Sequence, residues 1–237
     1  MCPARSFGNI VRSRFEQVPS GYAGYTQPMG HRRTVREIEV KLPIADLPGL
    51  IGKLRQMKAV CRGRVFEQNS LYDTPEQHFR RRGLLLRLRT KSPARSGHVA
   101  GGTRQTVLTA KAPVPASRSR YKEKLERELL VARPRRWRAR LLLLGFRPGF
   151  RYERYRTTFW LPGLHLEVDQ TPIGTFLELE GTPRAIDRTA RALGFSPRDY
   201  IQSTYWELFQ AHRRHRGRFS KNMLFGAKKS RRTALLP

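Results

Sequence analysis

The chain has 237 residues, of which 38% are hydrophobic and 10% aromatic, enough for one domain with a sizeable core but not comfortably for two. Lys and Arg number 48 against 18 Asp and Glu, and the formal net charge of +30 attracts polyanions such as nucleic acid, anionic membrane or polyphosphate. No stretch approaches the roughly 20 apolar residues that span a bilayer. The two cysteines, Cys2 and Cys61, support neither a disulfide framework nor a zinc site. We expect a cytoplasmic protein, monomeric or homodimeric, with no membrane partner.

The two ends of the chain differ in composition from the middle. Residues 1–32 are rich in Gly, Pro, Ser and Arg without sustained periodicity, and residues 212–237 are strongly basic. We therefore expect a flexible N-terminal segment (1–32), one folded domain (33–211) and a flexible basic C-terminal tail (212–237). The tail is interpreted as a solvated arm, and non-specific contact with a polyanion is the alternative.

The middle of the chain alternates between polar and apolar residues at period two, which is typical of β-strands. Segments with this pattern are, in chain order, EIEVKL, LLLRLRT, TVLTAKA, EKLERELL, YRTTFW, LHLEVD and TFLELE. A long loop is expected at 92–105. Helices are expected between or after these strands, several of them opened by proline, at residues 46–57, 75–82, 134–144, 183–193 and 197–212.

Charged residues occupy one face of each predicted strand. Residues two apart share a face, so Glu37, Glu39 and Lys41 point one way and the apolar residues between them point the other. A single charged face is typical of the wet side of a sheet, but paired acids and bases on strand after strand are not. If the apolar faces turn outward beneath the helices, the charged faces line the hydrated bore of a closed barrel.

The charges of this bore indicate its ligand. Arginine and lysine side chains contact phosphate oxygens, and the bases here are Lys41, Arg87, Arg89, Lys111, Arg154 and Arg156. The acids would repel phosphate unless hard cations such as Mg²⁺ or Mn²⁺ lay between, and they are Glu37, Glu39, Asp169, Glu178 and Glu180. The residues therefore predict a stack of acids, metal, phosphates and bases.

Together these segments resemble the CYTH superfamily, the triphosphate tunnel metalloenzymes, over roughly residues 36–210. The signature ExExK stands as Glu37 to Lys41, and the YDTP turn, the LRLR strand, LTAKAP and VDQTPIGTFLELEG follow in the expected order. The resemblance implies an α+β protein with a closed eight-stranded antiparallel β-tunnel, helices packed outside, Mg²⁺ or Mn²⁺ dependence, and a small-molecule triphosphate threaded through the bore. The last expected helix, with Tyr205, resembles the helix that closes one tunnel mouth.

The resemblance also implies roles for individual residues. The implied metal ligands are Glu37, Glu39, Asp169, Glu178 and Glu180. The implied phosphate ligands are Lys41, Arg87, Arg89, Lys111, Lys124, Arg154 and Arg156, although EKLERE and Arg154 depart from the common family pattern. The candidate catalytic residues are Glu37, Glu39, Lys41 and Glu128. A carboxylate such as Glu37, Glu39 or Glu128 would orient a water at the terminal phosphate.

Two reactions fit the same bore. Triphosphate hydrolysis is favoured because the visible residues account for triphosphate and metal, whereas no adenine pocket can be recognised. Class IV adenylyl cyclase activity, which makes cyclic AMP and pyrophosphate from ATP, is the close alternative. A nucleic-acid-binding module is a distant alternative, motivated by the net charge and opposed by the acids of the predicted bore.

Overall fold

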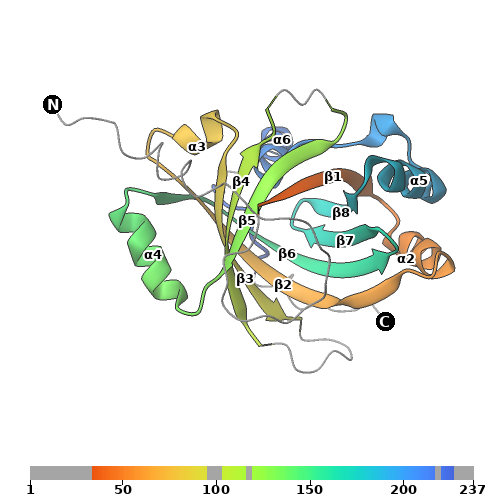
Figure 1. Ribbon diagram of the computed structural model, residues 1–237, viewed down its shortest axis with the longest axis horizontal. Helices are drawn as coiled ribbons and strands as arrows, with labels where there is room; N and C mark the ends of the chain where they lie inside the picture. Colours follow the sequence, from red (N-terminus) through yellow and green to blue (C-terminus); the bar gives the residue numbers. More distant parts are fainter. Residues whose placement is uncertain (1–33, 95–102, 116–118, 217–219, 227–237) are drawn as a thin grey trace. The chain divides into compact units, whose positions relative to one another are not determined.

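The computed structural model describes residues 34–94, 103–115, 119–216 and 220–226, and these form a closed barrel with helices around it (Figure 1). Eight antiparallel strands close in the order β1-β5-β4-β3-β2-β6-β7-β8. The α+β class and the closed eight-stranded antiparallel tunnel expected from the sequence are confirmed. The strands are β1 (Val35–Ile44), β2 (Val60–Asp73), β3 (Leu85–Pro93), β4 (Gln105–Pro113), β5 (Lys122–Leu130), β6 (Arg147–Leu161), β7 (Leu164–Thr171) and β8 (Gly174–Gly181).

Seven strands form where period-two alternation predicts them, and β2 is the strand that the alternation missed. Its register shifts between Cys61 and Gly63 and again between Leu71 and Tyr72. Gly63 has a positive φ of 121°, which favours glycine. Such β-bulges add a residue to one strand and so interrupt the period-two pattern on which the prediction depended.

Helices form in all five expected regions, but one is short and one is divided. Where residues 75–82 were expected to be helical, only four are, because the Asp73 carboxylate caps the amides of Phe79 and Arg80. The expected helix at 197–212 is interrupted because Ile201 N donates to Lys41 O at 2.9 Å, which holds that residue against β1. The helices are α2 (Leu47–Gln56), α3 (His78–Arg81), α4 (Pro134–Leu143), α5 (Pro183–Leu193), the 3₁₀ turn η1 (Pro197–Asp199) and α6 (Tyr205–Arg216).

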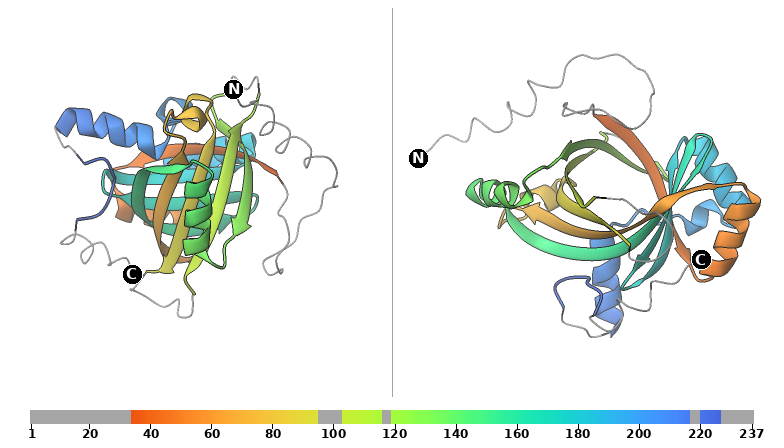
Figure 2. Two further views of the ribbon diagram at one scale, coloured as in Figure 1. Left: turned by 90° about the vertical axis from the view of Figure 1, so that its left-hand side faces the viewer. Right: turned by 90° about the horizontal axis from the view of Figure 1, so that it is seen from below.

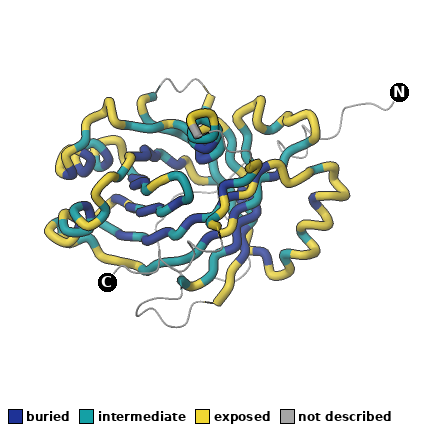
Figure 3. Tube along the Cα trace, turned by 180° about the vertical axis from the view of Figure 1, so that it is seen from behind, coloured by how far each residue is buried: buried dark blue, intermediate teal, exposed yellow. Residues whose placement is uncertain are grey.

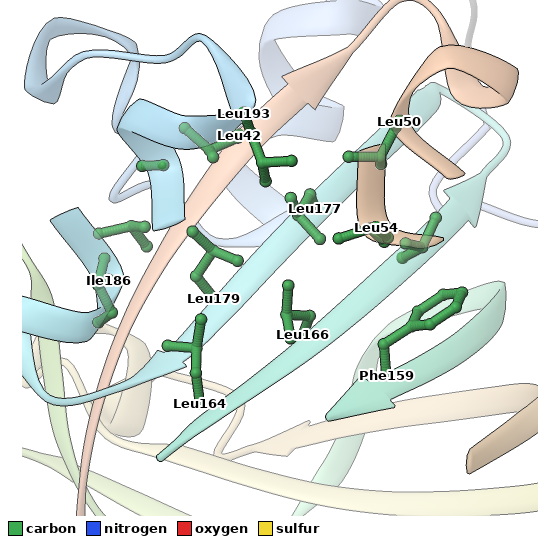
Figure 4. Packing of buried hydrophobic residues seen from close by; sticks show 13 residues of the cluster. Leu42, Leu50, Leu54, Phe159, Leu164, Leu166, Leu177, Leu179, Ile186 and Leu193 are labelled. Carbon is green, nitrogen blue, oxygen red and sulfur yellow. The ribbon is translucent and has the colours of Figure 1, made fainter. Parts of the chain in front are cut away.

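The largest hydrophobic core lies outside the barrel wall, between β1, β7 and β8 and the helices α2 and α5 (Figure 4). Leu42 of β1 and Leu179 of β8 are fully buried there against Leu54 of α2 and Ile186 of α5. Because these apolar side chains face the helices, the charged residues that alternate with them face the barrel interior. Buried residues accordingly concentrate in the strands (Figure 3), and α4 lies on the other side of the barrel from α2 and α5 (Figure 2).

The C-terminal residues correct the expectation that a flexible tail begins at 212. Helix α6 continues to Arg216, and residues 220–226 lie along the part of β6 that extends beyond β7. Met223 N donates to Arg151 O and Glu153 N donates to Met223 O, both at 2.9 Å. The Met223 side chain is fully buried beside Phe150, so hydrophobic burial and an unpaired strand edge hold this segment in place.

Parts of the expected organisation lie outside the described residues. These parts are the N-terminal segment to residue 33, most of the 92–105 loop, and residues 227–237 of the basic tail. The flexible N-terminal segment and the flexible tail beyond residue 226 therefore stay predictions. Across the described ranges, no helix has the length and apolarity needed to cross a membrane.

Candidate active site

The inward faces of the strands form a bore lined by charged side chains. These side chains point away from the helices into the closed barrel, which shields them from solvent. Ion pairs between them join neighbouring strands. The sequence-predicted site residues all lie buried or half-buried on these inward faces, and they are Glu37, Glu39, Lys41, Arg87, Arg89, Lys111, Lys124, Glu128, Arg154, Arg156, Asp169, Glu178 and Glu180.

Asp169 of β7 is the centre of a buried arginine cluster. Its carboxylate accepts from Arg154 Nη1 at 2.7 Å and from Nε and Nη2 of Arg156 at 2.7 and 2.6 Å. The Tyr205 hydroxyl of α6 donates to it at 2.7 Å, so the last helix does contribute to the bore. Burial opposes ionisation of neighbouring Glu178, but Lys41, Arg156 and Arg154 hold its pKa well below the usual value. Both carboxylates therefore orient bases, although Glu178 also lies opposite Glu167 in the β7–β8 register.

Strand β2 adds a carboxylate and an amide that the sequence analysis did not assign to the site. Glu67 is fully buried, and its Oε2 accepts from Arg154 Nε at 2.8 Å and lies 3.3 Å from Arg89 Nε. Asn69 Oδ1 accepts from Arg89 Nε at 2.9 Å. These two side chains therefore orient Arg89 and Arg154, as hydrogen-bond partners behind metal ligands orient those ligands in other sites. The one sequence signal for these two residues is that Glu67 and Asn69 are polar and two positions apart in the segment FEQNS, so that they share a strand face.

Arg87 and Tyr152 form a part of the bore with excess positive charge. Arg87 Nη1 lies 3.5 Å from the Tyr152 hydroxyl oxygen. Burial would raise the pKa of Tyr152, but Arg87 and two neighbouring arginines outweigh it and lower this pKa to about 8. Within the described residues, Arg87 Nε, Asn69 Nδ2 and Glu67 Oε1 are buried without a hydrogen-bond partner. The two unpaired donors match the acceptor oxygens of a phosphate group.

Acids and lysines alternate around β1. Lys111 Nζ donates to Glu37, and Lys122 Nζ donates to Glu39. Burial raises the pKa of Glu37 to about 7 in spite of Lys111. Glu180 lies opposite Glu39 in the β1–β8 register, and burial together with the charge of Glu37 raises the pKa of Glu180 to about 8. Burial acts on Glu39 in the same direction, but Lys122 and other lysines outweigh it and lower its pKa to about 2.

The carboxylates around β1 have the donor chemistry of a divalent-cation site. They offer oxygen atoms only, and burial raises the pKa values of Glu37 and Glu180, so a cation beside them would favour their charged forms. In the part of the chain that the structure describes, no three His, Cys, Asp or Glu side chains are close enough to hold one ion together. Lys111 and Lys122 hold Glu37 and Glu39 instead. The donor set thus fits Mg²⁺ or Mn²⁺, and a bound ion would displace these lysines.

Strand β5 lines the bore with residues of both signs. Lys122 contacts Glu39, although only Lys124 was expected to serve the site. Lys124, which is half-buried, instead donates from Nζ to Gly83 O at 3.0 Å. Glu128 accepts from Thr109 Oγ1 at 2.9 Å. The period-two pattern places Lys122 on the same face as Lys124, so its contribution could have been predicted.

A closed antiparallel tunnel with an inward-facing ExExK strand and a charged bore defines the class of triphosphate tunnel proteins. The chain belongs to the CYTH domain family, whose profile matches residues 35–205. No curated protein matches the chain.

Solved structures share the fold at low sequence identity. A candidate adenylate cyclase from Vibrio parahaemolyticus is 18% identical, with a TM-score of 0.60 over 73% of this chain and 97% of the other. A Pyrococcus horikoshii protein is 21% identical, with a TM-score of 0.62 over 74% and 98%. A candidate adenylyl cyclase from Hippeastrum, described as having a dominant triphosphatase activity, is 19% identical, with a TM-score of 0.50 over 74% and 95%.

Proposed function

We propose that this triphosphate-acting enzyme hydrolyses its substrate, and that the reaction depends on Mg²⁺ or Mn²⁺. The substrate class is inorganic triphosphate, thiamine triphosphate or a nucleoside triphosphate. One observation carries the proposal: arginines from β3 and β6 converge in a buried bore where Arg87 Nε and Asn69 Nδ2 lack an acceptor within the described residues. A polyphosphate supplies such acceptors in a row. A cytoplasmic location and a monomeric or dimeric state stay predictions.

The residues of the bore divide the work of phosphoryl transfer. Arg87, Arg89, Arg154 and Arg156 bind phosphate oxygens and stabilise the charge that develops on them. Glu67 and Asp169 keep these arginines oriented, which saves reorganisation during the reaction. Lys41, held at 3.2 Å from Glu178, supplies a further positive charge.

The acids of the bore hold the cation and the attacking water. Glu37, Glu39 and Glu180 would bind the divalent ion, which supplies positive charge beside the phosphates. Glu128 is only partly buried and hydrogen-bonds Thr109. It is therefore the carboxylate best able to accept a hydrogen bond from a water at the terminal phosphate, as a general base requires.

Hydrolysis is favoured over cyclisation because the aromatic side chains of the bore are already packed against other residues of the bore. A cyclase must hold a purine, and aromatic faces commonly do this by stacking. The Tyr205 hydroxyl donates to Asp169, and its ring packs at a tilt of 32° against the Tyr152 ring and has its centroid 4.6 Å from Lys41 Nζ. These rings therefore do not offer a free face on which a purine could stack. Cyclic AMP synthesis remains the second candidate, because two of the similar structures carry the name of that activity.

A product assay separates the two reactions. Inorganic triphosphate, thiamine triphosphate and ATP are offered separately with Mg²⁺, with Mn²⁺ and with EDTA, and phosphate, pyrophosphate and cyclic AMP are resolved. We expect phosphate release from a small triphosphate to dominate and to stop in EDTA. Cyclic AMP with pyrophosphate as main products would reverse the order of the two reactions, and equal turnover in EDTA would remove the role of the acids.

A further inference from the structure

Helix α4 lies on the side of the barrel away from α2 and α5 (Figure 2). It carries an unusual concentration of exposed arginines. Its outer residues are exposed, and within the described residues they form no ion pair. The sequence contains no Asp or Glu between Glu128 and Glu153. The exposed arginines of the helix and its flanks are Arg133, Arg135, Arg136, Arg138, Arg140 and Arg147.

The arginines at the start of the helix do not stabilise it, in contrast to Arg147, whose Nη1 donates to Leu142 O at the other end at 2.8 Å. Arg135 and Arg136 lie in its first turn, where the helix dipole is positive and acidic residues are favoured. The N-cap residue, Arg133, makes no side-chain capping hydrogen bond. Arg135 and Arg136 therefore reduce the stability of the helix that carries them, and a surface role accounts for these two residues better than a structural one.

The same helix ends in exposed leucines. Leu143 is 86% exposed, and Leu142 and Leu144 are 43% and 58% exposed. Helical spacing of three, four and seven residues puts Leu142 and Leu143 on the outward side above Arg135 and Arg136, whereas Leu141 and Trp137 face the barrel. One outward surface thus combines arginines in the first two turns with leucines in the last.

Neither end of this chain suits the surface. Residues 1–33 contain a single acid, Glu16, and residues 227–237 contain none, so both ends share the positive sign of α4. An RNA would pair with the arginines but leave the leucines in water. A groove in a protein partner would touch one stripe, whereas the arginines surround the helix on every side except that of Trp137 and Leu141. A layer of anionic lipid headgroups contacts a half-sunken helix on several sides and also accepts its leucines.

We propose that α4 docks the protein on the surface of an anionic lipid bilayer. The leucines at its end enter the boundary between headgroups and acyl chains, and the arginines bind the headgroups with their stems lying along the apolar layer. This replaces the expectation of no membrane partner, which considered only spanning segments. The proposal is independent of the reaction in the bore.

Flotation of the full-length protein with vesicles tests this docking. Vesicles of phosphatidylcholine are compared with vesicles that also contain phosphatidylserine, and we expect binding to the second kind only. The pair Arg135→Glu and Arg136→Glu should weaken binding by about fivefold or more for each arginine. The pair Leu142→Ser and Leu143→Ser should weaken it by about tenfold, since two apolar side chains no longer insert. All four residues are exposed, so folding should be unaffected, as thermal unfolding would verify.

A matched control carries the same charge change on another helix. Arg184 and Arg188 of α5 are also exposed arginines, and Arg184→Glu with Arg188→Glu should leave vesicle binding within about fivefold of native. An equal loss from both arginine pairs would reduce the effect to net charge and overturn the proposal. Undiminished binding of the leucine pair, or binding of single-stranded RNA or an acidic protein without any binding of vesicles, would overturn it too.

Discussion

Glu39 stands where β1 changes partners, opposite Lys122 of β5 and Glu180 of β8. Burial opposes its ionisation, but Lys122 and other lysines lower its pKa to about 2, so it is charged at neutral pH. A charged carboxylate at this place can either bind the divalent metal ion or hold Lys122 in an ion pair. Only the first role contributes directly to the reaction.

Replacing Glu39 separates these uses. Glu39→Gln keeps the shape and removes the charge, so if Glu39 binds the metal we expect turnover to fall by a factor on the order of 10² or more. Higher Mg²⁺ should restore part of it. The measurement is steady-state hydrolysis across a metal titration, with Glu76→Gln at an exposed position as the control. Near-native turnover of a folded Glu39→Gln protein at low metal would defeat the metal assignment.

Tyr152 gives the bore a pH dependence of its own. With its pKa at about 8, the phenol is neutral below that pH and becomes an anion above it. The anion would pair with Arg87 and so compete with the phosphates for the same charge. We expect the KM for triphosphate to rise as the pH passes 8, and Tyr152→Phe to remove this rise. The check is a KM–pH profile of both proteins, and a rise that persists in Tyr152→Phe would assign it to another group.

Among the elements, predictability followed the regularity of each strand. β1 and β8 alternate without interruption, so their charged and apolar faces could be predicted from the sequence. The bulges of β2 hid both the strand and its contribution of Glu67 to the arginine cluster. The interruption of the last helix could not be predicted either, because a contact between Ile201 and Lys41, far apart in the sequence, causes it.

The segment 220–226 changes what truncation of the basic end should do. Met223→Ala leaves a cavity in the cluster that contains Tyr152, so we expect a loss of about 2–5 kcal/mol in unfolding free energy. Leu224→Ala, at a 42% exposed position, should cost less than about 0.5 kcal/mol. Urea denaturation measures both. Equal stabilities of the two variants would mean that the segment does not hold its place on β6.

A cut placed after Gly226 should be tolerated, whereas a cut before Arg213 removes the strand-like pairing with β6. The interpretation of the basic end as a solvated arm therefore stays a prediction only for residues beyond 226.

On the scale of the whole molecule, the bore separates one group of its acidic residues from its arginines. Acids with raised pKa values lie around β1. Two donors without an acceptor among the described residues, Arg87 Nε of β3 and Asn69 Nδ2 of β2, lie beside the arginines of β3 and β6. A ligand that carries both metal and phosphates balances the two groups together. We expect Mg²⁺ and inorganic triphosphate together to raise the unfolding temperature by more than the sum of their separate effects, because each ligand supplies the charge that the other needs to bind. A ligand at about 100 times its Kd adds about 2.7 kcal/mol to the unfolding free energy. Additive or absent shifts in thermal unfolding would contradict this coupling.

The pairing of β1 has a consequence for how the chain is made. The first half of β1 pairs with β5 and the second half with β8, so its partners are completed only when Gly181 has left the ribosome. Chains are synthesised from the N-terminus, at about 5–20 residues per second. For several seconds the strand with the ExExK sequence is an open edge, and open edges recruit other strands. The strand made first is the last to be enclosed, so the nascent chain needs protection for longest at the segment on which its chemistry depends.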